Sequence, residues 1–138
     1  MKYALWIVQV LLALTFFAAG AMKLTQPIDA LAAQLAWPGD VPEGLVRFIG
    51  AAELLGAIGL IVPAATRILP WFTPLAALGL GLIMVLATVF HITRGEFIAV
   101  PVTLVQLALA TFVVYGRRRS LTALRPSAAP AGGHTRSA

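Results

Sequence analysis

The feature that most constrains the fold is residues 47–63, RFIGAAELLGAIGLIVP, because this stretch is apolar enough to cross a bilayer yet carries Glu53 in its middle. On a helix, Glu53 shares a face with small residues, including Gly50, Gly56 and Ala57. Small residues let a second helix come close in lipid, where no hydrophobic force drives helices together. A charged acid facing lipid costs at least about 2.5 kcal/mol. We therefore expect this segment to lie in a helix bundle with Glu53 turned inward.

The composition is that of an integral membrane protein with one domain. Of its 138 residues, 60% are hydrophobic and 11% are charged, whereas roughly a quarter of the residues of a soluble domain are charged. The chain has no cysteine, which excludes disulfides, thiolate metal sites and cysteine nucleophiles. The net charge of +5 does not indicate nucleic-acid binding. Four of the ten basic residues lie just after the last apolar segment, where they set topology: Arg117, Arg118, Arg119 and Arg125.

Four apolar segments predict an all-α transmembrane four-helix bundle with up-down-up-down topology. The expected spans are residues 3–22, 45–62, 69–92 and 97–115, within a membrane domain of residues 1–116, and Pro63 is expected to end the second span. A signal peptide is the competing interpretation of the first span, but the length of the run and the three spans after it favour a membrane helix. Residues 117–138 are rich in Arg, Ser, Pro, Ala and Gly, and we expect a disordered tail there.

Residues 25–44 form the only long connection between the predicted spans. Pro27 can start a short helix, after which Trp37 and Pro38 break regular structure. The connection is therefore either a short helix lying on the membrane surface or an ordinary loop. Five basic residues fall on the side of the termini and three on the other side. This bias predicts a multi-pass protein of the plasma (inner) membrane with both termini in the cytoplasm.

Polar side chains converge on the outer half of the predicted bundle, and each helix contributes one of them: Lys23, Glu53, His91 and Gln106. Glu53 lies roughly 12 Å below the outer end of its helix, at about the depth of Gln106. Glu53 either pairs with Lys23 or Gln106 and holds helices together, or acts as a proton acceptor or ligand anchor. We expect the inner half to be almost entirely apolar, and Arg47 to snorkel to the outer surface.

His91 is the second candidate for proton handling, in a relay with Glu53. The only other histidine, His134, is in the tail on the opposite side, so haem ligation by two histidines of one chain is excluded. We expect no metal site, because one histidine with carboxylate help is a weak ligand set. The sequence contains no phosphate-binding loop, dinucleotide fingerprint or nucleophile elbow.

Three stretches of the chain resemble the DoxX-like family of small four-span membrane proteins. They are FFAAGAMKL at residues 16–24, RFIGAAELLGAIGLIVP at 47–63 and PLAALGLGLIMVLATVFH at 74–91. The resemblance covers about residues 4–119, and its motifs map onto Gly20 and Lys23, onto Gly50, Glu53 and Gly56, and onto His91. We interpret the three glycines as packing positions. The resemblance implies a four-helix membrane bundle.

The function that this resemblance implies is association with redox chemistry. The family's name comes from a subunit linked to thiosulfate oxidation with quinone as acceptor, and other members are associated with oxidative-stress or redox complexes. The absence of cysteine argues against direct sulfur chemistry in this chain.

The leading hypothesis is a membrane subunit of a redox system, with an outer-half pocket for a quinone-like or other lipophilic molecule. The predicted ligand-binding residues are Lys23, Glu53, His91 and Gln106, and Glu53 and His91 are expected to handle protons. The alternatives are a non-catalytic assembly factor or scaffold that docks partners on its glycine and alanine faces, and a small proton-coupled permease. The expected partners are the lipid bilayer and a membrane or membrane-associated redox protein. A homo-oligomer and catalytic turnover both stay open.

Overall fold

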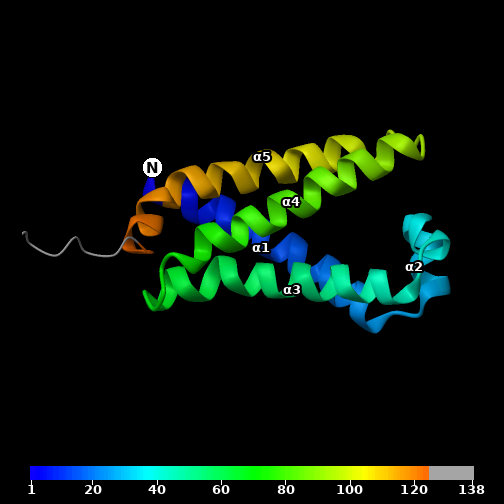
Figure 1. Ribbon diagram of the computed structural model, residues 1–138, viewed down its shortest axis with the longest axis horizontal. Helices are drawn as coiled ribbons and strands as arrows, with labels where there is room; N and C mark the ends of the chain where they lie inside the picture. Colours follow the sequence, from blue (N-terminus) through cyan, green and yellow to red (C-terminus); the bar gives the residue numbers. More distant parts are fainter. Residues whose placement is uncertain (125–138) are drawn as a thin grey trace, which may run out of the picture.

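The computed structural model describes residues 1–124, and within this range the chain is helical without a strand. Four long helices run the length of the molecule (Figure 1): α1 (Lys2–Thr25), α3 (Glu43–Thr66), α4 (Phe72–Thr93) and α5 (Val100–Arg117). Their directions alternate, which confirms the predicted all-α bundle with up-down-up-down topology. The 3-10 helix η2 (Arg118–Leu124) continues from α5. Residues 125–138, most of the predicted tail, lie outside the described residues.

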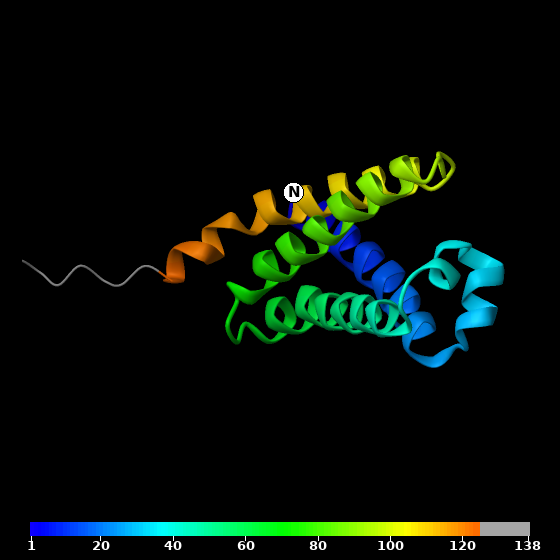
Figure 2. The same cartoon turned by 45° about the vertical axis from the view of Figure 1, so that its right-hand side comes forward.

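Two short helices stand at one end of the bundle, which we call the α2 end (Figures 1 and 2). They are α2 (Ile28–Leu35), the short helix that was one of the two alternatives for the segment after Pro27, and the 3-10 helix η1 (Trp37–Asp40). The opposite end holds the start of α1, the α3–α4 turn and the end of α5, and we call it the basic end. The two ends collect different charges, since the acidic residues outside α3 lie in segments of the α2 end.

The long helices associate mainly as two pairs, α1 with α3 and α4 with α5. Figure 1 shows α1 starting beside α5 at the basic end and finishing beside α3 at the α2 end. Apolar side chains of all four helices fill the interior between them, among them Leu12, Phe16, Leu60, Leu80, Met84 and Val113. The interior therefore contains few polar side chains.

The outward faces of the long helices are also apolar. Large hydrophobic side chains lie exposed along each of them, for example Leu14, Leu55, Leu82 and Val105. Contiguous apolar surface of this kind is typical of helices that contact lipid. At about 1.5 Å per residue, the 24 residues of α1 or α3 are long enough to cross the roughly 30 Å apolar core of a bilayer. All four helices have the length and composition of membrane spans, and the chain is a membrane protein.

The helix α3 continues through Pro63 to Thr66, although we expected Pro63 to end it. Proline has no N–H to donate to the carbonyl four residues before it, which here belongs to Gly59. Helices in membranes tolerate this loss where a neighbouring helix supplies donors. In the same turn, Gln9 of α1 donates a hydrogen bond to the carbonyl of Leu60. A side chain of the adjacent helix thus supports the turn that proline weakens.

The helix α4 begins at Phe72, three residues later than the expected start of its span. The turn before it contains two non-glycine residues in the left-handed backbone region, Arg67 with a φ of 59° and Leu69 with a φ of 51°. L-residues rarely adopt this conformation outside turns. The chain therefore reverses direction over a longer turn than its hydropathy indicates.

The helices α1 and α3 lie closest together at Gly20 and Gly50. A Cβ atom added at Gly20 would lie 2.6 Å from the backbone oxygen of Gly50, and one added at Gly50 would lie 2.7 Å from the Cβ atom of Lys23. Gly56 faces α4, where an added Cβ would lie 2.6 Å from Cδ2 of Leu80. Glycine at these positions therefore sets how near α3 lies to its neighbours.

We predict that Gly20→Ala destabilises the bundle by about 1–3 kcal/mol, because the new methyl group would overlap backbone atoms that cannot move aside. Gly79→Ala is the matched control, since an added Cβ at Gly79 meets no atom within 4 Å. The measurement is unfolding of the purified protein in mixed micelles by titration with sodium dodecyl sulfate. Equal stability of the two variants would contradict the close approach of α1 and α3.

Candidate functional site

The buried carboxylate of Glu53 points toward α1 and forms an ion pair with Lys23. The distance from Nζ of Lys23 to Oε2 of Glu53 is 2.7 Å, and the two side chains are only 9% and 5% exposed. Lys23 follows Gly20 by three residues and Glu53 follows Gly50 by three, so the pair lies on the same helix faces as the glycine contact. Of the arrangements that the sequence left open, Glu53 adopts the pairing with Lys23.

Arg47 of α3 contacts the end of α1 at the same crossing of the two helices. Its guanidinium donates hydrogen bonds to the backbone carbonyls of Lys23, at 2.5 Å, and Gln26, at 2.8 Å. Glu43, one turn earlier on α3, accepts a further hydrogen bond from it at 2.9 Å. The last carbonyls of a helix have no donor within that helix. Arg47 therefore caps α1 rather than simply snorkelling to the surface, because the close crossing brings these carbonyls within its reach.

His91, at the end of α4, pairs with Glu96 of the α4–α5 turn. Its Nδ1 lies 2.6 Å from Oε2 of Glu96, and Nε of Arg94 lies 2.7 Å from the other oxygen of that carboxylate. Arg94 also pairs with Asp40 of η1 at 2.5 Å. These ion pairs join the α4–α5 turn to η1. The ring of Trp37 in η1 also makes an edge-to-face contact with the ring of Phe90.

Glu96 is the central acid of this second group. Hydrogen bonds from Arg94 and then His91 favour the charged carboxylate, and they hold the pKa of Glu96 below its usual range. The hydrogen bonds to Glu96 and then to Asp40 raise the pKa of Arg94. Gly95, with a φ of 71°, supplies the left-handed backbone that turns the chain back toward His91.

The predicted site residues thus belong to separate ion-paired groups. We call Lys23, Glu53, Arg47 and Glu43 the α1–α3 clamp, and His91, Glu96, Arg94 and Asp40 the turn cluster. Over residues 1–124, no side-chain hydrogen bond joins one group to the other, so the predicted relay from Glu53 to His91 has no direct link there. Gln106 is half-buried on α5 and belongs to neither group. The hydroxyl groups of Thr88 and Thr103 join α4 to α5 instead, with their oxygens 2.7 Å apart.

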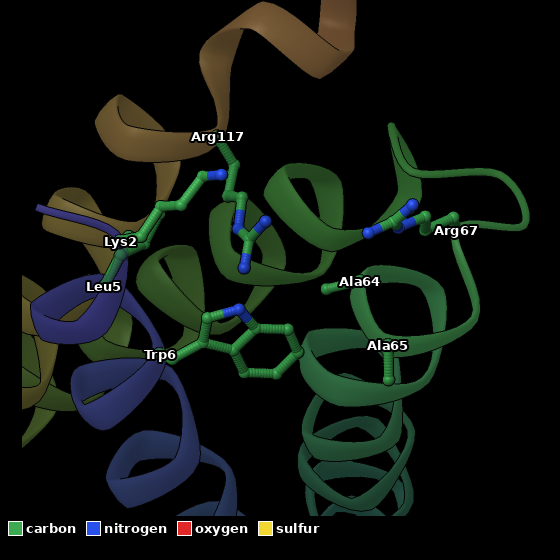
Figure 3. Close-up of a pocket in the computed structure, with 7 residues that line it drawn as sticks. All are labelled: Lys2, Leu5, Trp6, Ala64, Ala65, Arg67 and Arg117. Atoms are coloured by element: carbon green, nitrogen blue, oxygen red, sulfur yellow. The ribbon is translucent and has the colours of Figure 1, made fainter.

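Two cavities in the described part of the chain lie away from both groups. One, of about 360 Å³, is at the basic end between α1, the end of α3 and the end of α5 (Figure 3). The other, of about 350 Å³, is an apolar groove between α1 and α3 near Phe17 and Ile58. Neither is lined by any of the four polar residues predicted to form an outer-half pocket.

A polar contact that the sequence analysis missed lies in the half that we expected to be apolar. Gln9 is fully buried on α1, where its amide nitrogen donates to the carbonyl of Leu60 and its amide oxygen accepts a hydrogen bond from Nε of Arg117 at 3.1 Å. An amide side chain within an apolar helix is costly to leave unpaired. A lone glutamine in the first span was therefore the signal that could have revealed this contact.

These features define a class: a small membrane protein of four spanning helices, with two groups of ion-paired side chains at the α2 end. The model of the DoxX-like family matches residues 7–113, which is well over half of the chain. The chain therefore belongs to the DoxX-like family, as its motifs indicated. Comparison with curated proteins and with solved structures found no match.

We predict that removing either partner of the Lys23–Glu53 pair, by Lys23→Met or by Glu53→Gln, destabilises the protein by about 3–5 kcal/mol. The reason is that the remaining charged side chain stays buried without its counter-charge. The double variant should lose less than the sum of the single losses. The exposed Glu43–Arg47 pair supplies the control, and Glu43→Gln should cost only about 0.3–0.5 kcal/mol. Additive losses in the double variant, measured by unfolding in mixed micelles, would show that the two groups do not interact.

We also predict that acid loosens the turn cluster only below the usual pKa of a glutamate. Because folding lowers the pKa of Glu96, the stabilisation from this carboxylate is complete above its unfolded pKa and is lost as the pH falls through the folded pKa. Fluorescence of Trp37, measured in a Trp6→Phe/Trp71→Phe background, should therefore change below about pH 4.5, and Glu96→Gln should remove the change. A transition near pH 6, or one unaffected by Glu96→Gln, would contradict this assignment.

Proposed function

We propose that this protein is a membrane subunit of a redox system, and that His91 and Glu96 handle protons for a quinone-like or other lipophilic molecule at the α2 end. The supporting observation is the 2.6 Å contact between Nδ1 of His91 and the carboxylate of Glu96. A carboxylate on one ring nitrogen fixes the orientation of the imidazole. The second nitrogen, Nε2, is then the atom that exchanges a hydrogen bond or a proton with the ligand.

Aromatic side chains near His91 support a ligand with a flat ring. The ring of Trp37 lies edge-to-face with that of Phe90, with 6.0 Å between centroids, and the ring of Phe90 lies 5.8 Å from the imidazole of His91. Arg94 lies over the same Phe90 ring at 5.3 Å. Aromatic surfaces with a few polar groups are the usual lining of small-molecule sites. The association with redox chemistry itself rests on what the DoxX-like resemblance implies, and the electrons would come from a partner protein.

In this proposal Glu53 has a structural part. Its carboxylate is engaged by Lys23 within the α1–α3 clamp, at 2.7 Å, and contributes to the contact between the two helices. Proton handling, which we predicted for Glu53 and His91 together, is therefore proposed for His91 with Glu96. Lys23 and Gln106, which were also predicted to bind the ligand, have no assigned contact with it.

The test is binding of a short-chain ubiquinone to the purified protein in phosphatidylcholine nanodiscs. His91→Gln should weaken binding about tenfold, which corresponds to the loss of one charge-assisted hydrogen bond. Glu96→Gln should also weaken binding, because the imidazole loses the carboxylate that orients its ring. The matched control is His134→Gln, which replaces the only other histidine and lies outside the described residues.

The outcomes separate the parts of the proposal. Absence of ubiquinone binding in every variant would remove the quinone-like ligand. Equal binding by the wild type and His91→Gln would remove the role of His91. Loss of binding in Glu53→Gln, with its helix content unchanged, would return the proton-handling role to Glu53.

A second candidate, a non-catalytic assembly factor or scaffold, is favoured by one observation. The charged residues of the α1–α3 clamp and of the turn cluster are paired within the chain, as in a site that serves structure. Crosslinking in membranes followed by mass spectrometry tests this candidate. A reproducible protein partner, together with absence of ubiquinone binding, is the result expected of a scaffold.

A further inference from the structure

We infer that the cavity at the basic end binds a phosphate group, either that of an anionic phospholipid or a free phosphate. This site is separate from the function proposed above and lies at the opposite end of the bundle. The cavity of about 360 Å³ is within the size range of small-ligand sites, roughly 300–1,000 Å³. Its lining contains three cationic side chains, from Lys2, Arg67 and Arg117, and no acidic one.

The up-down-up-down topology brings these three cations together from distant parts of the sequence. Lys2 is the first residue of α1, Arg67 follows the end of α3, and Arg117 is the last residue of α5. Figure 3 shows the side chains of Lys2 and Arg117 beside each other above Trp6, with the guanidinium of Arg67 directed toward them from the α3–α4 turn. Three like charges at one cavity repel one another unless an anion lies between them.

The chain supplies no acidic side chain to neutralise this end. All five of its acids lie between residues 29 and 96, and those outside α3 belong to segments of the α2 end: Asp29, Asp40 and Glu96. The two acids of α3, Glu43 and Glu53, are paired with Arg47 and Lys23. Arg118 and Arg119 add further positive charge next to the cavity in sequence. The counter-charge for the basic end must therefore come from outside the side chains of this protein.

Arg117 is held in place for such a contact. Its Nε donates to Gln9, and its guanidinium lies over the ring of Trp6 with 5.1 Å between Cζ and the ring centroid. Its Nη2 is buried and has no hydrogen-bond partner among residues 1–124. A guanidinium offers several donors in a fixed fork, which suits the oxygens of a phosphate. Two contacts thus orient the fork, and a donor stays unused.

The backbone of Arg67 gives independent support. This residue has φ 59° and ψ 14°, the left-handed conformation at the end of a helix that glycine adopts most readily. Arginine at this position is unfavourable for the turn itself, and such outliers cluster at binding sites. The side chain lines the cavity, so contact with an anion accounts for an arginine where the backbone favours glycine.

The position of the cavity at the ends of the spanning helices favours the phosphate of a lipid head group as its ligand. Its cations lie at the ends of spanning helices, and Trp6 beside them has the amphipathic ring that is typical of the interface. Basic pockets between helix ends at this level suit the head groups of anionic lipids. A free phosphate offers the same oxygens, and the experiment below separates the two sources.

The experiment compares phosphate binding by the full-length protein and two single variants in detergent. One titration adds phosphatidylglycerol with phosphatidylcholine as reference, and bound lipid is counted by native mass spectrometry. A second adds inorganic phosphate and follows the thermal unfolding temperature. Arg67→Gly removes a lining cation while relieving the left-handed backbone, so it should fold at least as well as the wild type. Arg119→Gln removes one charge at the same end from a residue that does not line the cavity.

The expected result is that Arg67→Gly weakens binding of phosphatidylglycerol or of inorganic phosphate about tenfold or more, as for loss of one charge-assisted contact, while Arg119→Gln stays within about twofold of the wild type. An effect in the lipid titration identifies a head-group site, and an effect only with inorganic phosphate identifies a site for a soluble anion. Equal binding by the wild type and Arg67→Gly, or an equal loss in Arg119→Gln, would overturn the inference.

Discussion

The ion pair between Lys23 and Glu53 is the contact on which the arrangement of α1 and α3 depends. A lone charge is costly in a lipid environment, and each of these residues supplies the counter-charge of the other at 2.7 Å. The pair forms only because Gly20 and Gly50 let the two helices approach closely. The same crossing brings the last carbonyls of α1 within reach of Arg47. The two glycines, the buried ion pair and the cap supplied by Arg47 thus all lie at one crossing of α1 and α3.

The two ends of the bundle treat charge differently, and this contrast organises the functional proposals. At the α2 end the turn cluster joins α4 to η1 through pairs of opposite charge, and His91 belongs to this cluster through Glu96. The reactive feature of that end is an imidazole that Glu96 orients. At the basic end the cations have no acidic side chain of their own chain. An external anion is the counter-charge that we infer for that end.

Hydropathy and the position of one acid were enough to predict the class of fold and the inward direction of Glu53. They were not enough to choose its partner, because several polar groups share its depth and helix rotation decides among them. The pairing of His91 with Glu96 depends on the backbone of a short turn, which hydropathy does not describe. The contact between Gln9 and Arg117 joins the first and last spans. Only the packed bundle brings such distant residues together, although a single glutamine in an apolar helix was a signal from which a buried contact could have been predicted.

The most direct test of the α1–α3 clamp is the distance between a lysine Nζ and a glutamate carboxyl carbon, measured by solid-state NMR in lipid bilayers. The chain has two lysines and three glutamates, and its other lysine, Lys2, lies at the basic end, where there is no acid. A dipolar coupling in protein labelled with ¹⁵N-lysine and ¹³C-glutamate is therefore assigned to Lys23 and Glu53. The structure predicts a strong coupling, in keeping with the 2.7 Å contact, that disappears in Glu53→Gln. Absence of this coupling in the wild-type protein would contradict the account.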